Sequence, residues 1–290
     1  MVNFQNKDIK ELLEFGIINI DKSSGPTSFN ISDFVRKKLN LRKTSHFGTL
    51  DPKVTGVLPI ALNRACKLTG YFLGEDKEYI GVMRIHEDIS LDKIKKTIKE
   101  KFLGKIKQTP PVRSRVKRQE RIREIKKFNI LEKNGKNILF HVECEGGTYI
   151  RKICSDLGDY MKIGTHMLEL RRIRAGIIRE HDKKYPSINL YEFLQAVDEY
   201  KKGNEELLKR MIIPAEIITQ LHPIIKVKER EVKRLLTGKP IFKEDLTRKE
   251  KMETGKIICV FSEERFIGMY KVTNNGDIFA KSEFVMQPIK

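Results

Sequence analysis

Apolar and polar positions along the first two thirds of the chain follow both strand and helix spacing. The short apolar run Gly16–Ile20 predicts a buried strand, and the alternation over Lys77–His86 predicts a half-buried one. After Ser90, apolar residues recur every three or four positions, which predicts a capped amphipathic helix. The same patterns predict strands at Gly56–Leu62, Ile122–Leu131, Ile138–Cys144 and His166–Ile173, and helices after Thr27 or Ser28, through Cys66, and at Ile150–Met161, Leu190–Tyr200 and Glu205–Met211.

The pattern of predicted elements changes between Pro214 and Pro223, from mixed helices and strands to mostly short strands. One helix is predicted beyond this point at Glu229–Leu236, followed by short strands joined by tight turns at 262–265 and 274–277. These strands are expected at Lys256–Phe261, Phe266–Val272 and Ile278–Val285. We therefore expect two domains, residues 1–220 and a small β unit of residues 221–290. The larger domain mixes helices and strands without a strict alternation, which favours an α+β fold.

The net charge of the chain indicates which class of molecule it binds. The chain of 290 residues has 58 Lys and Arg against 39 Asp and Glu, a net charge of +19. Such an excess indicates a polyanion, either nucleic acid or an anionic membrane. No apolar run approaches the roughly 20 residues that span a bilayer, and no basic amphipathic helix with a large apolar face is evident. Four cysteines without a C-x-x-C pair make a zinc site unlikely and favour a cytoplasmic protein with reduced thiols.

Basic residues concentrate between Lys105 and Lys127. Ten basic residues stand there against Glu120 and Glu124, so the local net charge is 10 − 2 = +8. Pro110 and Pro111 exclude a regular helix in the first half of the stretch. A solvated charged loop is one interpretation; we favour a mobile clamp on RNA phosphates. A second cluster, 171–174, alternates arginines with an apolar residue, and a half-buried strand would direct its successive arginines to different faces.

Candidate chemistry centres on Asp51, in the polar segment 41–55, which contains Gly48 and Pro52 and is predicted to be a loop just before a buried strand. Taken alone, Asp51-Pro52 indicates an Asx-turn. Two other segments change this interpretation: Tyr149 and Arg151 stand at the entrance to a predicted helix, and Tyr79 begins a predicted strand. A carboxylate kept ionised by an arginine, with aromatic rings that stack on a planar ligand, is typical of a nucleobase site.

Three motifs together resemble the pseudouridine synthases of the TruB and dyskerin superfamily, in particular the archaeal catalytic subunit of the H/ACA guide-RNA ribonucleoprotein. They are the segment 16–28 with Lys22, the aspartate motif 48–59, and the segment 147–151 with 166–172 downstream. The resemblance covers nearly the whole chain. It implies a mixed, largely antiparallel central sheet flanked by helices, and a small C-terminal β-barrel of the PUA type.

The resemblance also implies roles for individual residues. Asp51 matches the nucleophile, Tyr79 the tyrosine that stacks on the target base and assists proton transfer, and Arg151 the partner of the carboxylate. Further matches are Tyr149 and Leu170 in the pocket lining, Lys22 at the floor of the site, His46 beside the RNA strand, and Arg113, Arg115, Lys117 and Arg118 in an RNA-binding thumb loop. For Lys22 and His46, a purely structural role is an equal alternative.

The implied reaction isomerises uridine to pseudouridine in RNA without cofactor or metal, after the base has left the stack. Whether Asp51 attacks the pyrimidine ring or the ribose carbon stays open.

The short path from Tyr79 to Ser90, the thumb-like loop and the terminal unit resemble the guide-RNA enzyme. The expected partners are then an H/ACA guide RNA, substrate rRNA or tRNA, small Gar-type and Nop-type proteins, and a kink-turn-binding ribosomal-type protein. The alternatives are a stand-alone enzyme of the tRNA TΨC loop and a non-catalytic RNA-binding protein.

Overall fold

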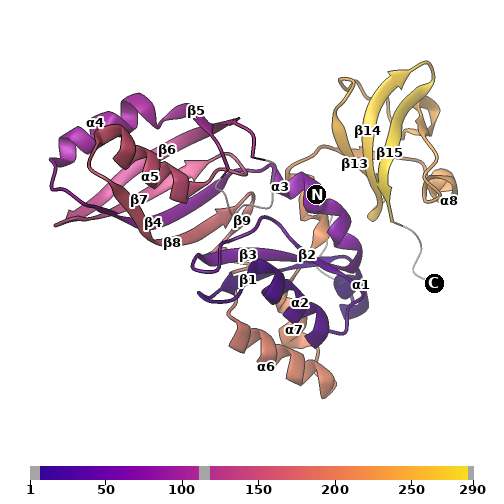
Figure 1. Ribbon diagram of the computed structural model, residues 1–290. Coiled ribbons are helices and arrows are strands. Elements are labelled where there is room, and N and C mark those ends of the chain that lie inside the picture. Colours follow the sequence, from indigo (N-terminus) through magenta and orange to yellow (C-terminus); the bar gives the residue numbers. More distant parts are fainter. Residues whose placement is uncertain (1–6, 111–117, 287–290) are drawn as a thin grey trace. The chain divides into compact units, whose positions relative to one another are not determined.

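One mixed sheet organises the larger of two structural units. The computed structural model describes residues 7–110 and 118–286. It divides the chain into one unit of residues 17–212 and another of residues 1–16 and 213–290. In the larger unit the strands follow the order β1-β3-β8-β4-β7-β6-β5, with β2 beside β3 and β9 beside β8 (Figure 1). Only the pairing of β3 with β8 is parallel among these strands, so the expected mixed, largely antiparallel sheet is confirmed. The strands are β1 (Gly16–Lys22), β2 (Thr44–His46), β3 (Thr55–Leu62), β4 (Lys77–Ile85), β5 (Gly104–Gln108), β6 (Arg121–Asn134), β7 (Asn137–Cys144), β8 (Thr165–Ala175) and β9 (Ile178–Arg179).

Side-chain caps start three of the described helices in this unit. Thr27 caps α2 (Ser28–Lys38) in a reciprocal capping box with Asn30. Ser90 caps α4 (Leu91–Lys101), whose buried face includes Ile94 and Ile98. The remaining helices are η1 (Asn63–Leu68), α3 (Thr69–Leu73), α5 (Ile150–Met161), α6 (Leu190–Lys201) and α7 (Glu206–Met211). In Figure 1, α4 and α5 lie beside the strands β4 to β8, whereas α2, α6 and α7 lie beside β1 and β3.

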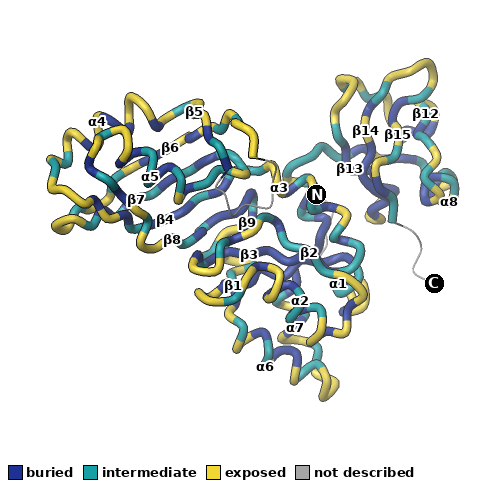
Figure 2. Tube along the Cα trace, viewed as in Figure 1, coloured by how far each residue is buried: buried dark blue, intermediate teal, exposed yellow. Residues whose placement is uncertain are grey.

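The smaller unit is a curled five-stranded sheet in the order β11-β13-β14-β15-β12. Its core is apolar and includes the buried residues Leu235, Ile258, Val260 and Tyr270. Figure 2 shows β13 and β14 as buried along most of their length. This half-barrel is consistent with the expected PUA-type domain. β10 (Ile212–Pro214) is an edge strand of the larger sheet, next to β1 in the strand order. The elements of the smaller unit are η2 (Ala215–Gln220), β11 (Ile224–Lys226), η3 (Glu229–Glu231), α8 (Val232–Leu235), β12 (Ile241–Phe242), η4 (Lys243–Asp245), β13 (Ile257–Ser262), β14 (Arg265–Asn275) and β15 (Ile278–Val285).

An N-terminal helix that the sequence patterns did not predict belongs to this smaller unit. Asp8 caps α1 (Ile9–Glu14), and the ring of Phe15, just after it, stacks on Phe266 with centroids 5.2 Å apart. Lys7 also pairs with the buried carboxylate of Glu216. Segments far apart in the sequence thus share one core. The boundary expected between residues 220 and 221 stays a prediction.

Two expectations about local structure were wrong. The stretch 105–127 is in large part a β-hairpin: β5 pairs with the first residues of β6, from Gly104↔Ile125 to Gln108↔Arg121. Alternation of charged and aliphatic residues on both strands allows this pairing, since the proline pair lies beyond β5. The expected loop 41–55 contains the short strand β2. Across the described ranges, no helix combines the length and apolarity needed to cross a membrane.

Candidate active site

The Asp51 loop, residues 48–56, connects β2 to β3 and is held by backbone contacts from several elements. Ser28, at the start of α2, accepts a hydrogen bond from the Leu50 N–H at 2.8 Å and donates to the Leu50 carbonyl at 3.1 Å. The N–H of Gly25 donates to the carbonyl of Pro52 at 3.0 Å. Gly48 and Gly56 have φ values of +106° and +100°, and a Cβ at Gly56 would clash with the backbone oxygen of Arg172. The loop therefore has one defined conformation.

Lys22 fixes the second half of the loop from below. Its ammonium is buried and donates to the carbonyls of Ser23, Pro52 and Val54 at 2.9, 2.9 and 2.8 Å. Burial lowers the pKa of Lys22, and the nearby charge of Asp51 opposes that shift. With all three donors directed at carbonyls, Lys22 acts on the loop backbone, in line with the structural alternative for this residue.

Asp51 meets Arg151 at the opening of the site. Their side chains form an ion pair at 3.1 Å, and each is about half exposed (52% for Arg151, 48% for Asp51). Arg151 stands in the first turn of α5, a helix whose N-cap, Tyr149, has no side-chain cap hydrogen bond. The buried amide of Gln108 bonds instead to the backbone of Tyr149 itself: it accepts from the N–H of Tyr149 at 3.1 Å and donates to its carbonyl at 3.2 Å. The last residue of β5 thereby anchors the chain just before Arg151.

Tyr79 lies on the wall of the same site. It is buried in β4, within electrostatic range of Asp51, and burial raises its pKa, whereas a hydrogen bond from Arg172 and the charge of Arg172 lower it. Leu170 is also buried and pairs with Gly81, two residues along β4 from Tyr79. Alternate residues of a strand share a face, so Leu170 lies on the Tyr79 face of the sheet.

His46 lies at the edge of the Asp51 loop, where its Nε2 is 3.1 Å from the hydroxyl of Thr49. Burial and the charge of Arg172 lower its pKa, so the ring is neutral near pH 7. The structure thus brings Asp51, Arg151, Tyr79 and Lys22 around one loop, with His46 at its edge.

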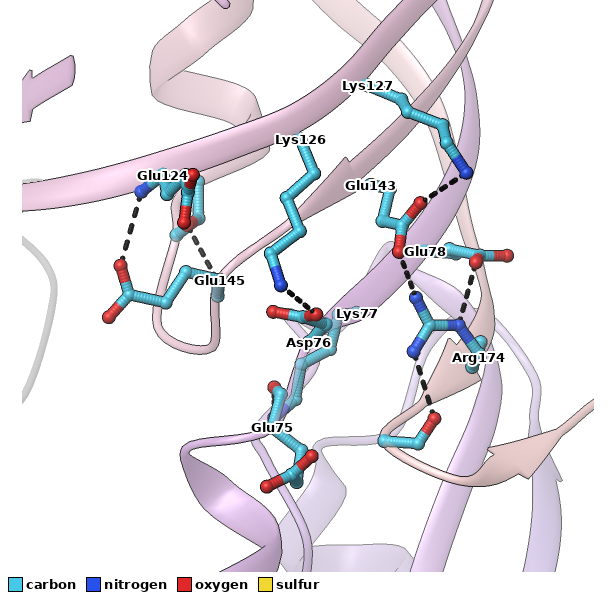
Figure 3. A network of polar contacts seen from close by, with 12 residues as sticks. Glu75, Asp76, Lys77, Glu78, Glu124, Lys126, Lys127, Glu143, Glu145 and Arg174 are labelled. Carbon is cyan, nitrogen blue, oxygen red and sulfur yellow. Dashed lines mark hydrogen bonds and ion pairs between the residues drawn. The ribbon is translucent and has the colours of Figure 1, made fainter. Parts of the chain in front are cut away.

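Of the four predicted thumb-loop residues, the structure describes only one. Arg118 is exposed, and Arg113, Arg115 and Lys117 lie outside the described residues. The rest of the basic stretch is on the hairpin β5–β6, where Lys126 pairs with Asp76 at 2.5 Å and Lys127 with Glu143 at 2.8 Å (Figure 3). These pairs are partly exposed and leave the hairpin with an excess of positive charge.

Three buried polar residues support the site although the sequence patterns assigned none of them a role in it; Arg172 was noted only as part of the arginine cluster 171–174. Arg172 is 1% exposed and donates to the carbonyls of Val57 at 2.8 Å and Gly48 at 3.0 Å. Lys77 donates to the carbonyls of Phe72, Leu73 and Glu75, and burial, reinforced by the charge of Arg172, lowers its pKa to about 8. The third is Gln108. An arginine at an inward-facing strand position is the only signal that could have revealed one of them.

Comparisons with known proteins agree with this geometry. Residues 36–150 match the family model of the TruB family pseudouridylate synthase N-terminal domain, and residues 151–220 match that of the tRNA pseudouridylate synthase B C-terminal domain. A probable tRNA pseudouridine synthase B of Methanocaldococcus jannaschii is 42% identical over 241 residues, 83% of this chain and 70% of the relative. Its counterpart in Methanopyrus kandleri is 37% identical over 274 residues, 93% and 80% of the two chains.

Solved structures give the same result. A chain in a Cbf5-Nop10-Gar1 complex superposes with a TM-score of 0.87 at 33% identity, covering 97% of this chain and 88% of that one. A chain of an H/ACA ribonucleoprotein bound to a substrate RNA containing 2′-deoxyuridine superposes with a TM-score of 0.86 at 30% identity, covering 99% and 92%. Fold and site thus define an RNA-modifying isomerase. The chain belongs to the TruB family of pseudouridylate synthases.

Proposed function

We propose that the Asp51 loop carries out the isomerisation of uridine to pseudouridine, with Asp51 as the nucleophile. The observation that carries this proposal is the ion pair of Asp51 with Arg151 at 3.1 Å, at the open side of an otherwise backbone-pinned loop. Arg151 holds the carboxylate directed at the substrate, and the partial exposure of the pair leaves room for a flipped nucleotide. Attack by Asp51 allows the glycosidic bond to break and the uracil to turn, so that its C5 bonds to the ribose carbon and the bond to Asp51 is released. A base then removes the proton from C5, and the freed N1 takes up a proton, so the product is an isomer of the substrate.

The remaining matched residues have supporting roles in this proposal. Tyr79 stacks on the target base and takes part in proton transfer, while Tyr149 and Leu170 line the pocket. Lys22 holds the loop from below through three backbone carbonyls. His46, neutral at pH 7, stands beside the RNA strand, and Arg113, Arg115, Lys117 and Arg118 contact phosphates.

In this proposal, an H/ACA guide RNA selects the uridine that the enzyme modifies. Only residues 86–90 separate β4 from α4, and this short path resembles that of the guide-RNA enzyme. The C-terminal residues from His222 onward carry 15 basic and 10 acidic residues, a net charge of 15 − 10 = +5, which suits RNA contact. Residues 221–290 then act as the domain that holds the ACA end of the guide, and residues 1–220 as the catalytic domain.

Small Gar-type and Nop-type proteins, a kink-turn-binding ribosomal-type protein and a cytoplasmic location belong to the same proposal. The likeness to a chain that is assembled with Nop10 and Gar1 supports the Gar-type and Nop-type proteins among these partners.

A second candidate is direct modification of tRNA. The names of the archaeal relatives, probable tRNA pseudouridine synthase B, favour this target. The two candidates share the chemistry and differ in what selects the uridine.

The test is pseudouridine formation by the full-length protein on two substrates, a tRNA transcript and a guide-complementary RNA. Each is assayed with and without an H/ACA guide and the partner proteins. Guide affinity is measured in parallel at physiological salt with competitor RNA, because a +19 protein binds any RNA at low salt. We expect weaker binding when the ACA of the guide is changed. Equal affinity for both guides, together with modification of free tRNA, would favour the tRNA enzyme.

A further inference from the structure

The pairing of β4 with β8 contains an irregularity beside the site. Glu78 pairs with Arg174, but the next residue, Tyr79, pairs with Arg172, so Ile173 has no partner in the register. This is the arrangement of a β-bulge, in which two residues of one strand oppose one residue of the other. Without the bulge, Arg172 and Arg174, two residues apart, would lie on the same face of the sheet.

The bulge sends the two arginines to different faces. Arg174 joins the face of Glu78, where it donates to Glu78 and Glu143 at 2.8 Å each (Figure 3). Arg172 joins the face of Tyr79 and is almost completely buried. One arginine therefore completes an ion network away from the Asp51 loop, and the other becomes a cation inside the site.

Arg172 has an unusual set of partners for a buried arginine. Buried guanidinium groups are normally paired with carboxylates. Among the described residues, none of the ion pairs involves Arg172; its donors reach the carbonyls of Gly48 and Val57 and the hydroxyl of Tyr79. Gly48 is the first residue of the Asp51 loop, and Val57 directly follows its last residue. A Cβ at Gly48 would come within 3.2 Å of Nη1 of Arg172, so the glycine allows this close approach.

We propose that Arg172 is a positioning residue of the isomerase site: one buried guanidinium fixes both ends of the Asp51 loop and holds the phenol of Tyr79 beside it. Because the guanidinium has no carboxylate to neutralise it, its charge acts on Tyr79 and favours the ionised phenol. Arg172 thus links the geometry of the carboxylate to the protonation state of the tyrosine. Its importance for turnover rests on the proposed function, whereas its effect on Tyr79 does not.

The first experiment needs no substrate. The protein is labelled with 3-fluorotyrosine, and the ¹⁹F resonance of Tyr79 is assigned by its absence in Tyr79→Phe. Its titration is then followed in wild type, in Arg172→Met and in Arg174→Lys. Removal of a neighbouring cation raises a phenol pKa, so we expect the midpoint of Tyr79 in Arg172→Met to rise by about one pH unit or more. Arg174→Lys, on the other face, leaves the midpoint unchanged. An unmoved midpoint in folded Arg172→Met overturns the inference.

Arg172→Lys separates charge from geometry and serves also if Arg172→Met does not fold. An ammonium retains the charge but cannot bridge two carbonyls and a hydroxyl as the planar guanidinium does. We expect a near-wild-type Tyr79 midpoint, a turnover number lowered about tenfold or more, and an unchanged KM for RNA. Unchanged turnover in this variant overturns the loop-fixing part of the inference. If Asp51→Asn is inactive while the Arg172 variants behave as wild type, the proposed function stands and the role of Arg172 fails.

Discussion

The Asp51 loop and the basic hairpin β5–β6 differ in how their polar side chains are held. The loop is held by buried donors, Lys22, Ser28 and Arg172, that bond directly to backbone atoms. The hairpin presents exposed lysines such as Lys107, whose ion pair with Glu120 joins two largely exposed side chains. Bond rearrangement needs atoms fixed to a fraction of an ångström, whereas attraction of phosphates needs only charge within a Debye length. Substitutions in the loop should therefore lower mainly the rate of the reaction, whereas substitutions in the hairpin should lower mainly the affinity for RNA.

The largest effect is expected at the nucleophile. Asp51→Asn keeps the size of the side chain but removes its charge, so isomerisation should fall by about 10³-fold or more while RNA affinity persists. Tritium release from RNA labelled at uridine C5 measures the reaction. Asp88→Asn, which alters an exposed carboxylate paired with Lys133, is the matched control and should retain full activity. Pseudouridine formation by Asp51→Asn at the wild-type rate would remove Asp51 from the mechanism.

The two regions can be compared directly with one type of substitution. Lys22→Met leaves three buried carbonyls without their donor, and should lower the free energy of unfolding by about 2–3 kcal/mol and turnover by about 10²-fold. Lys126→Met breaks only a partly exposed pair with Asp76, so it should cost less than about 1 kcal/mol. Urea denaturation and single-turnover rates test both variants. Similar losses from the two would abolish the distinction between the regions.

A smaller effect is expected where the hairpin meets the site. Gln108→Ala removes both hydrogen bonds to the backbone of Tyr149 and loosens the start of α5, so the rate should fall about tenfold. RNA affinity should change little, because no charge is lost. Gln119→Ala, on an exposed residue of the same segment, is the control. A loss confined to RNA affinity would show that Gln108 acts through binding.

The smallest effect on chemistry is expected from the thumb-loop charges. Reversal of Arg113, Arg115 and Lys117 together should flatten the slope of log affinity against log salt by about two units. The rate at saturating RNA should stay within about twofold of wild type. Reversal of Lys93, Lys95 and Lys99, exposed on α4, matches the change in net charge. Equal slopes for the two triple variants would identify the basic stretch as an ordinary solvated surface.

Much of the architecture was predictable because its signals are local. The helix Ile150–Met161 and the cap at Thr27 follow from apolar spacing and capping chemistry within a few residues. The strand predicted at Ile122–Leu131 is confirmed as part of β6, but its hairpin partner β5 was not predicted, because a dense run of charges masks the strand alternation there. The helix α1 was also missed: its six residues carry little periodicity, and its buried face depends on residues more than 200 positions away.

The sequence by itself determined the order of elements, the net charge and the identity of Asp51, Tyr79 and Arg151 as matches to a known motif. These depend on residue type and spacing, which are properties of the chain alone. Only the tertiary structure decided that Arg172 and Arg174 lie on opposite faces, that Gln108 anchors Tyr149, and that Lys22 holds Pro52 and Val54. The physical reason is that a bulge and a buried donor are defined by their partners, and those partners come from strands distant in sequence.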